Sequence, residues 1–314
     1  MAILVSGSLA YDYIMNFPDS FKNHILPDQI HILNVCFTVD KLAKSWGGTA
    51  GNIAYTLSLL GNEVLIASAL GSDSREYLAH LRTKNINTEY ILKDSARLTA
   101  SAYITTDIDD NQVTAFYNGP LDLAASLDFR PLQKSVTLAL ISPTNKDVMI
   151  KHLRESRSLG WTTVFDPGQQ LTAFKSEELT ACLGQANIVI GNDYEIRLLE
   201  KQSGLTTADI LKSSDLIITT LGAKGSVIST QDGQIIAIAP CKPNSVDDPT
   251  GAGDAYRAGF CAGYEHSLPL KTCGQMGAVA ASFAIETYGT QAHTFTKIEF
   301  AERYEKTYGE KLGL

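Results

Sequence analysis

The chain has 314 residues, of which 44% are hydrophobic and 19% charged, and its formal net charge at pH 7 is −8. This length suits one large α/β domain, alone or with a smaller subdomain, and the apolar fraction excludes a disordered or fibrous chain. Because an acidic surface repels phosphate backbones, we expect no nucleic-acid partner.

The N-terminus and the cysteines bear on the cellular compartment. Residues 1–15 lack a basic start and Asp12 interrupts their apolar run, so we expect no signal peptide. No stretch reaches the ~18 uncharged apolar residues of a membrane-spanning helix, so we expect no membrane partner. The five cysteines are scattered and form no CxxC pair, which is typical of small hydrophobic residues with reduced thiols. These features predict a cytoplasmic protein.

Short apolar runs alternate with helical patterns along most of the chain. Strands are predicted over 2–8, 63–70, 136–142, 162–166, 187–191 and 215–221. Helices are predicted over 49–60, 74–84, 146–159, 193–202, 206–212, 251–265 and 270–287. The strand segments are rich in Val, Ile and Leu with little polar alternation, which favours a parallel sheet covered on both faces. The repeated strand-then-helix order predicts a doubly wound α/β core.

Two stretches, 11–45 and 97–118, carry strand patterns without intervening helices. Within the second, 103–105 and 113–117 flank the polar turn 107–111, which predicts an antiparallel hairpin. Strands inserted after the first core strand would form a small sheet standing off the body as a lid; a decorated edge of the main sheet is the alternative. The division predicted is a lid over 11–45 and 97–118, and a core over 1–10, 46–96 and 119–314.

The most informative motif is Asp248-Pro-Thr-Gly-Ala-Gly-Asp254, at the start of a predicted helix. The small residues Gly251, Ala252 and Gly253 let their N–H groups approach a ligand, and unsatisfied N–H groups at a helix start favour an anion. The motif therefore predicts a phosphate cradle, with Asp254 placed beside it as a general base. Ordinary helix capping is the alternative. Walker A and GxGxxG motifs are absent, which removes the main support for P-loop and dinucleotide-binding folds.

Two further motifs lie at other predicted element ends. In Trp46-Gly-Gly-Thr-Ala-Gly-Asn52 the glycines allow close approach and Asn52 offers a donor and an acceptor, which suits sugar hydroxyls. In Asn192-Asp-Tyr-Glu195 the acidic side chain follows an apolar strand, where α/β proteins bind ligands, and Glu195 is suited to hold Mg²⁺ through water. A glycine turn and an acidic helix N-terminus are the alternatives.

A last motif and an early aspartate complete the candidates. Thr219-Thr-Leu-Gly-Ala-Lys-Gly225 follows another strand, where its hydroxyls and glycines would line a nucleotide, although a strand-to-hairpin turn explains them equally well. Asp12 comes four residues after the first predicted strand and points into the same region if the topology is right; a turn residue is the alternative.

Together these motifs resemble the ribokinase-like (PfkB) family of carbohydrate and nucleoside kinases over nearly the whole chain, with GGTAGN, NDYE, TLGAKG and DPTGAGD in order. Within the family the chain is most similar to the bacterial, mycobacterial-type adenosine kinases. That similarity rests on GSLAYDYIMNFP, ILPDQIHILNVCFTVDKL, DPGQQL and GNDYE.

The resemblance implies a fold and an activity. The fold is a three-layer α/β/α core with a mostly parallel central sheet and a small β-sheet lid. The activity is transfer of the ATP γ-phosphate to the 5′-hydroxyl of adenosine, giving AMP and ADP in purine salvage. Alternatives within the family are inosine, guanosine, cytidine or a free sugar such as ribose as acceptor. A non-catalytic nucleoside-binding protein is a remote alternative, because it would need neither a base nor a metal site.

The resemblance also implies roles for particular residues. Asp254 would be the base, and Gly251, Ala252 and Gly253 the anion hole. The acceptor would be bound by Ser8, Asp12, Gly48, Asn52, Phe116, Gln169 and Gln170, and ATP by Asn192, Thr220, Gly222 and Gly225. Glu195 would serve Mg²⁺ through water, and Asp248, with the segment 289–291, a K⁺ ion.

Two expectations concern the lid. Phe116 would stack on a purine, although plain packing is more common for an aromatic on a hairpin. The related enzymes tend to carry an aromatic residue in the first lid strand, where this chain has Ala100-Ser-Ala-Tyr103; Tyr103 would then replace the missing ring, or the purine would be stacked on one side alone. An exposed lid sheet also makes a homodimer through the lid plausible.

Overall fold

The computed structural model describes residues 1–25, 34–109 and 111–313. Part of the segment 25–42 used for the resemblance, and Asp110 in the predicted turn 107–111, therefore lie outside the described residues.

The central sheet has the strand order β13-β12-β11-β10-β9-β8-β1-β4-β5 within the described part of the chain. These strands are β1 (Ala2–Ser6), β4 (Val64–Leu70), β5 (Ile91–Lys93), β8 (Val136–Ile141), β9 (Thr162–Phe165), β10 (Ile188–Asn192), β11 (Leu216–Thr220), β12 (Ser226–Thr230) and β13 (Ile235–Ile238). Neighbours from β5 to β11 are parallel, and β12 and β13 follow as antiparallel strands. The mostly parallel sheet is confirmed.

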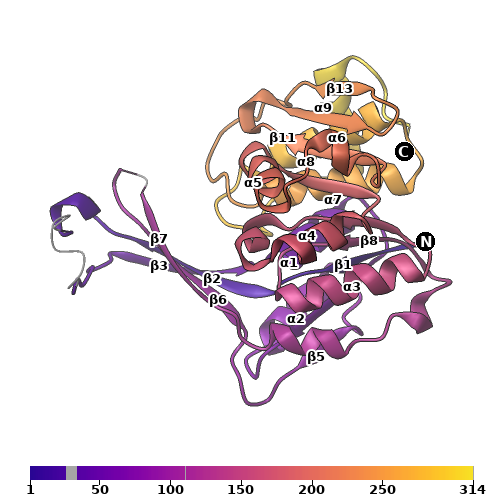
Figure 1. The fold of residues 1–314 in the computed structure, drawn as a ribbon. Helices are drawn as coiled ribbons and strands as arrows, with labels where there is room; N and C mark the ends of the chain where they lie inside the picture. The colour runs from indigo at the N-terminus through magenta and orange to yellow at the C-terminus, as the bar shows by residue number, and fades with distance from the viewer. Residues whose placement is uncertain (26–33, 110, 314) are drawn as a thin grey trace.

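Helices cover both faces of this sheet (Figure 1). One face packs against α1 (Thr49–Leu59), α2 (Arg75–Thr83), α7 (Ala252–Glu265), α8 (Leu270–Ala284) and α9 (Lys297–Tyr308). The other packs against α3 (Lys146–Ser158), α4 (Ser176–Leu183), α5 (Asp193–Ser203) and α6 (Thr207–Ile210). Because successive side chains of a strand point to opposite faces, Ile3 and Val5 of β1 join the first core and Leu4 the second. The result is the expected three-layer core.

A second sheet, with the strand order β3-β2-β6-β7, projects from one side of the core (Figure 1). Its strands are β2 (Ala10–Asn16), β3 (Lys41–Gly47), β6 (Ala100–Thr106) and β7 (Gln112–Tyr117). β6 and β7 form the predicted antiparallel hairpin, and β6 runs parallel to β2. Every residue of β7 is exposed, so this strand is an open edge.

Several elements were not predicted. They are β5, the antiparallel pair β12 and β13, and the helices α4 and α9. For α9 a local signal existed, because Thr296 and Glu299 form a capping box at its start. The helix predicted over 206–212 is a single turn, which ends where the N–H groups of Ser213 and Ser214 both bond to the carbonyl of Ile210.

Two expectations about composition can be compared with the fold. No helix in the described part of the chain combines the length and apolarity needed to cross a membrane. All five cysteines are free thiols; four are buried as small hydrophobic residues would be, and Cys36 is exposed.

Candidate active site

The seven residues expected to bind the acceptor all line one cavity of about 360 Å³. They are Ser8, Asp12, Gly48, Asn52, Phe116, Gln169 and Gln170. The cavity lies where the end of β1, the start of α1, the root of the small sheet and the loop after β9 meet. Its lining is completed by Thr49, Ala102, Thr114, Asn118, Leu121, Pro143 and Thr144.

The start of α1 shows why this wall needs glycine and serine. Gly48 has a φ of +85°, and a Cβ there would lie 2.5 Å from the carbonyl oxygen of Ser8. A side chain at this position is therefore excluded. Ser8 caps α1 from a distance, because its Oγ accepts the N–H of Thr49 (3.1 Å) and its carbonyl that of Ala50 (3.0 Å).

The small sheet presents one face to the cavity. Asp12, Ala102 and Phe116 are cross-strand neighbours on that face, and Phe116 is 48% exposed. Tyr103 follows Ala102, so it points to the opposite face, where it stacks on Tyr13 with ring centroids 5.0 Å apart. The expectation that Tyr103 replaces a missing purine-stacking ring is wrong, because strand alternation turns it away from the cavity.

The glycine-rich motif opens α7 as predicted. Gly251 is the N-cap with a φ of +82°, and no side chain caps the helix. Asp248 instead binds the flanking backbone: its Oδ1 accepts the N–H of Thr250 (2.9 Å), and its Oδ2 that of Gly289 (3.0 Å). No side chain caps this start, and the N–H of Ala252 donates to the carbonyl of Pro249 (3.2 Å), whereas those of Gly251 and Gly253 have no acceptor within the described residues. We call residues 251–253 the cradle.

Asp254, in the first turn of α7, connects the cradle to the cavity. Its Oδ2 accepts a hydrogen bond of 2.8 Å from Nδ2 of Asn52. Asn52 is itself held, because its Oδ1 accepts from Nε2 of Gln291 (3.1 Å). Burial raises the pKa of Asp254 to about 6, against the lowering effects of Arg257 and Asn52. A carboxylate with this pKa suits a proton acceptor near neutral pH.

Asp12 is a buried carboxylate that lines the cavity. It is 9% exposed, and its Oδ2 is 3.5 Å from the hydroxyl of Thr290. Burial, with a smaller contribution from the charges of Asp254 and Asp248, raises the pKa of Asp12 to about 7, against the lowering effect of the Thr290 hydrogen bond. The charged and neutral forms of this carboxylate are therefore similarly populated near pH 7.

The residues expected to bind ATP form a separate group at the ends of β10 and β11. Asn192 and Thr220 are register partners across these strands. Gly222 and Gly225, with φ of +57° and +90°, bound the turn that follows β11, and Gly222 faces open space. The turn therefore requires both glycines, and within the described residues no atom lies within 4 Å of a Cβ placed on Gly222.

Asn192 and Glu195 cap α5 reciprocally. Oδ1 of Asn192 accepts the N–H of Glu195 (2.8 Å), and Oε2 of Glu195 accepts the N–H of Asn192 (2.8 Å). The alternative of an acidic helix N-terminus thus describes their local structure. Burial, and then the charge of Asp166, raises the pKa of Glu195.

The sequence interpretation missed two charged residues that join these groups. Arg257, one turn after Asp254 on α7, is paired with Asp166 at the end of β9, and both are buried at 7% and 1% exposure. Its Nη2 is also 3.8 Å from Oε2 of Glu195. The available signal was an arginine in the middle of a helix whose other charged residues, Asp254 and Glu265, lie near its two ends.

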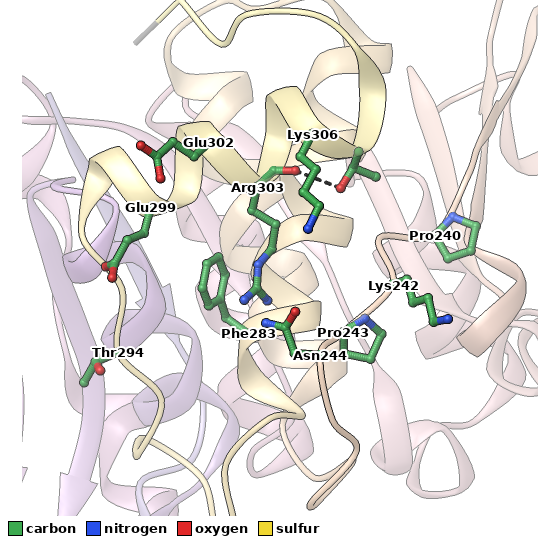
Figure 2. Close-up of a pocket in the computed structure, with 11 residues that line it drawn as sticks. Pro240, Lys242, Pro243, Asn244, Phe283, Thr294, Glu299, Glu302, Arg303 and Lys306 are labelled. Carbon is green, nitrogen blue, oxygen red and sulfur yellow. Dashed lines mark hydrogen bonds between the residues drawn. The ribbon is translucent and has the colours of Figure 1, made fainter.

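A second and larger hollow, of about 670 Å³, lies between α9, the end of α8 and the segment 240–244 (Figure 2). It contains none of the expected site residues. Its arginine, Arg303, is already paired with Glu286 through bonds of 2.8 and 3.0 Å and lies over the ring of Phe283. This hollow is therefore separate from the predicted site residues.

Comparisons with known proteins agree with this architecture. The family model described as pfkB family carbohydrate kinase matches residues 10–297. The nucleoside kinase of Methanothermobacter thermautotrophicus is 31% identical over 314 residues, covering 98% of this chain and 96% of that protein. The solved nucleoside kinase of Methanocaldococcus jannaschii has a TM-score of 0.85 and 31% identity, over 97% of this chain and 98% of that one.

A bacterial structure is also similar. The nucleoside kinase of Burkholderia thailandensis in complex with inosine has a TM-score of 0.90 and 33% identity, covering 98% of this chain and 99% of that one. The same protein in complex with ADP-inosine has a TM-score of 0.87 and 34% identity, over 98% and 97% of the two chains.

This arrangement is the ribokinase-like architecture of small-molecule kinases. It combines a three-layer core, a small sheet that projects from one side of it, and a glycine cradle at a helix start. The chain belongs to the PfkB family of carbohydrate kinases. The fold and family expected from the motifs are confirmed.

Proposed function

We propose that this chain is an ATP-dependent nucleoside kinase that phosphorylates the 5′-hydroxyl of adenosine, giving AMP and ADP. The observation that carries the proposal is the position of Asp254. It belongs to the uncapped start of α7, yet its carboxylate is bonded to Asn52 in the wall of the cavity. A base in this position reaches an acceptor in the cavity and a phosphate on the cradle together.

The reaction follows from these positions. Asp254 takes the proton of the 5′-hydroxyl, and the oxygen forms a bond to the γ-phosphorus of ATP as the bond to the β–γ bridging oxygen breaks. ADP leaves with that oxygen. The N–H groups of Gly251 and Gly253 would face the negative charge carried by the transferring group, while that of Ala252 donates to Pro249. Preorganised donors of this kind are a large part of catalysis in phosphoryl transfer. Asp12, Gly48 and Asn52 would hold the ribose hydroxyls.

The residues near Glu195 fit Mg²⁺ bound through water. Oε1 of Glu195 accepts no hydrogen bond within the described residues, and Mg²⁺ usually keeps several of its waters. In the described part of the chain no three His, Cys, Asp or Glu residues are grouped to bind a metal directly. Glu195 would therefore hold the ion at one water's distance, where it would neutralise charge on the phosphates.

The choice of acceptor rests on the cavity lining. Phe116 offers an exposed ring on the cavity face of the small sheet, and Gln169 and Gln170 line the same cavity with amide groups, which suits a flat base with polar edges. The Burkholderia relative carries inosine in its structure, which favours another nucleoside as the second candidate. Ribose would leave Phe116 and both glutamines unused.

The test is ADP release, measured by a coupled assay, with adenosine, inosine, guanosine, cytidine and ribose at one ATP concentration. Adenosine is expected to give the highest kcat/KM. A higher value for another nucleoside would replace adenosine as the acceptor while keeping the enzyme class. Nucleoside binding by calorimetry without ADP release would instead support a non-catalytic binding protein.

The pH dependence of kcat/KM for the nucleoside should report the ionisation of Asp12 and Asp254. Asp12, with a pKa of about 7, and Asp254, with a pKa of about 6, are both expected to act in the ionised form. The value of kcat/KM should therefore fall as the pH drops below 7. Below pH 6 both groups become protonated, so the fall should exceed the about tenfold per pH unit that one group produces. Asp12→Asn should reduce the slope to that of one group. A flat profile between pH 5 and 8 would contradict both assignments.

A K⁺ ion beside Asp248 is part of the proposal. Each oxygen of this buried carboxylate accepts one backbone N–H, which leaves lone pairs for a cation, and Asp248 already joins the segment before the cradle to Gly289. Potassium is expected to raise kcat over choline at equal ionic strength, and Asp248→Asn to weaken this response. Equal rates in both salts would leave Asp248 as a backbone cap alone.

We also propose that two copies pair through the small sheet, which acts as the lid predicted over 11–45 and 97–118. Its face away from the cavity exposes Leu42, Tyr103, Val113 and Tyr117, and β7 is an open edge. Sedimentation velocity at micromolar concentration should show a dimer that Val113→Glu dissociates. The matched change Ile235→Glu, at an exposed position on β13, should not alter the species. A monomeric wild-type chain would exclude the pairing.

A further inference from the structure

Arg257 presents one edge of its guanidinium to Asp166. Nη2 donates to Oδ1 of Asp166 (2.8 Å), and Nε lies in ion-pair contact with Oδ2 without forming a hydrogen bond. One hydrogen bond and one ion-pair contact along the same edge orient the planar guanidinium. Its remaining nitrogen, Nη1, must therefore point away from Asp166 in a defined direction.

That direction leads to the cradle. Helical side chains lean toward the N-terminus of their helix, so Arg257 lies over the turn that contains Gly253. A Cβ on Gly253 would be 2.9 Å from Nη1, so the guanidinium occupies the space beside this glycine. Within the described residues Nη1 has no hydrogen-bond acceptor, although the other two nitrogens are engaged by Asp166 and lie near Glu195.

The surrounding charge makes this nitrogen significant. Asp166, Glu195 and Asp254 approach Arg257 from the end of β9, the first turn of α5 and its own helix α7. Burial alone would lower the pKa of Arg257, but the charge and hydrogen bonds of Asp166, followed by Asp254 and Glu195, raise it. The guanidinium is therefore a permanent buried cation among carboxylates, at the place where a triphosphate would add more negative charge.

We propose that Nη1 of Arg257 binds the γ-phosphoryl group of ATP during transfer, and that Asp166 is the positioning residue that holds this edge toward the cradle. This rests on the proposed roles of the cradle and Asp254. A cation fixed beside the cradle would stabilise charge on the transferring group without reorganising during the reaction. Gly253 is needed because a side chain there would occupy the position of the guanidinium.

The experiment uses variants that keep the buried charges balanced. Arg257→Ala combined with Asp166→Asn removes the cation without leaving its partner charged, and Arg257→Lys keeps a charge without the planar edge. The matched control is Arg303→Gln combined with Glu286→Gln, since that arginine–carboxylate pair joins α9 to the residue after the C-cap of α8, outside the site. Circular dichroism and thermal melting establish that each variant folds.

Turnover should separate the roles. The Arg257/Asp166 variant is expected to lose about 10²–10³-fold in kcat, with the nucleoside Kd within about twofold, as for removal of one preorganised donor. Millimolar guanidinium should restore part of the loss, and sodium should not. The control pair should stay within threefold of wild type. Full recovery of the rate above pH 8 would show that Arg257 acts only through the protonation of Asp254, and would overturn the proposal.

A binding measurement makes the result independent of the acceptor. Calorimetry should measure the affinity of the Arg257/Asp166 variant for a non-hydrolysable ATP analogue and for ADP. The affinity for the analogue should fall about tenfold and that for ADP should change little, because the contact is to the γ-phosphoryl group. Arg257→Lys serves if the double variant does not fold. Equal losses for both nucleotides would overturn the proposal. A wild-type chain that binds the analogue more tightly than ADP, yet phosphorylates no nucleoside, would refute the proposed function and leave this inference standing.

Discussion

Asp254→Asn is expected to lower kcat by ~10²–10⁴-fold while the nucleoside affinity changes little. The amide oxygen can still accept the hydrogen bond from Asn52, so the wall of the cavity keeps its shape. An amide cannot take the proton of the 5′-hydroxyl, so the nucleophile is no longer activated. The measurement is ADP release under saturating substrates, together with nucleoside binding by calorimetry.

The matched control for this variant is Asp147→Asn. Asp147 also stands in the first turn of a helix, α3, but outside the cavity and the cradle, so its loss should leave kcat within twofold of wild type. Near-wild-type turnover by Asp254→Asn would assign the proton to another group. Asp12 would then be the candidate, because it is a buried carboxylate that lines the cavity.

Arg257→Ala is expected to reduce the free energy of unfolding by about 3–5 kcal/mol, the usual cost of removing one partner of a buried ion pair. Asp166 is 1% exposed, so its charge would remain without compensation in the interior. Adding Asp166→Asn should recover much of the loss, because a neutral amide has less need of a counter-ion. Urea unfolding with an unchanged m value measures both effects.

The double variant, Arg257→Ala with Asp166→Asn, distinguishes the loss of a counter-charge from the loss of packing. If the cost of Arg257→Ala came from the cavity left by the side chain, Asp166→Asn would recover none of it. A loss below about 1 kcal/mol for the single variant would mean that solvent or a neighbouring group compensates Asp166. Either result would change the account of how three carboxylates are tolerated around α7.

Local patterns were sufficient for the elements that carry the motifs. The β1, β4, β8, β9, β10 and β11 strands were predicted because each is a short apolar run buried on both faces. The start of α7 was predicted from the small residues Gly251, Ala252 and Gly253 that open a helical pattern, and the structure shows Gly251 as the N-cap with a positive φ. β5 and the β12–β13 pair were missed because fewer of their residues are buried, so they differ from the buried apolar runs of the predicted strands.

The site shows the same division. The motifs identified which residues belong to it, and the structure brings the seven expected acceptor residues to one cavity. Their roles stay predictions. Tyr103 was misplaced because a side chain's face depends on strand register, which a one-residue shift reverses.

The sequence by itself determined the fold class, the family and the chemical character of the cradle, since these depend on residue types at fixed local spacings. The tertiary structure alone decided the connections between distant segments. Asn52 meets Asp254 across 202 positions, and Arg257 meets Asp166 across 91. The physical reason is that such contacts depend on strand order and on which helix face turns inward. No short segment specifies these features by itself, so the buried cation beside the cradle became visible only in the folded chain.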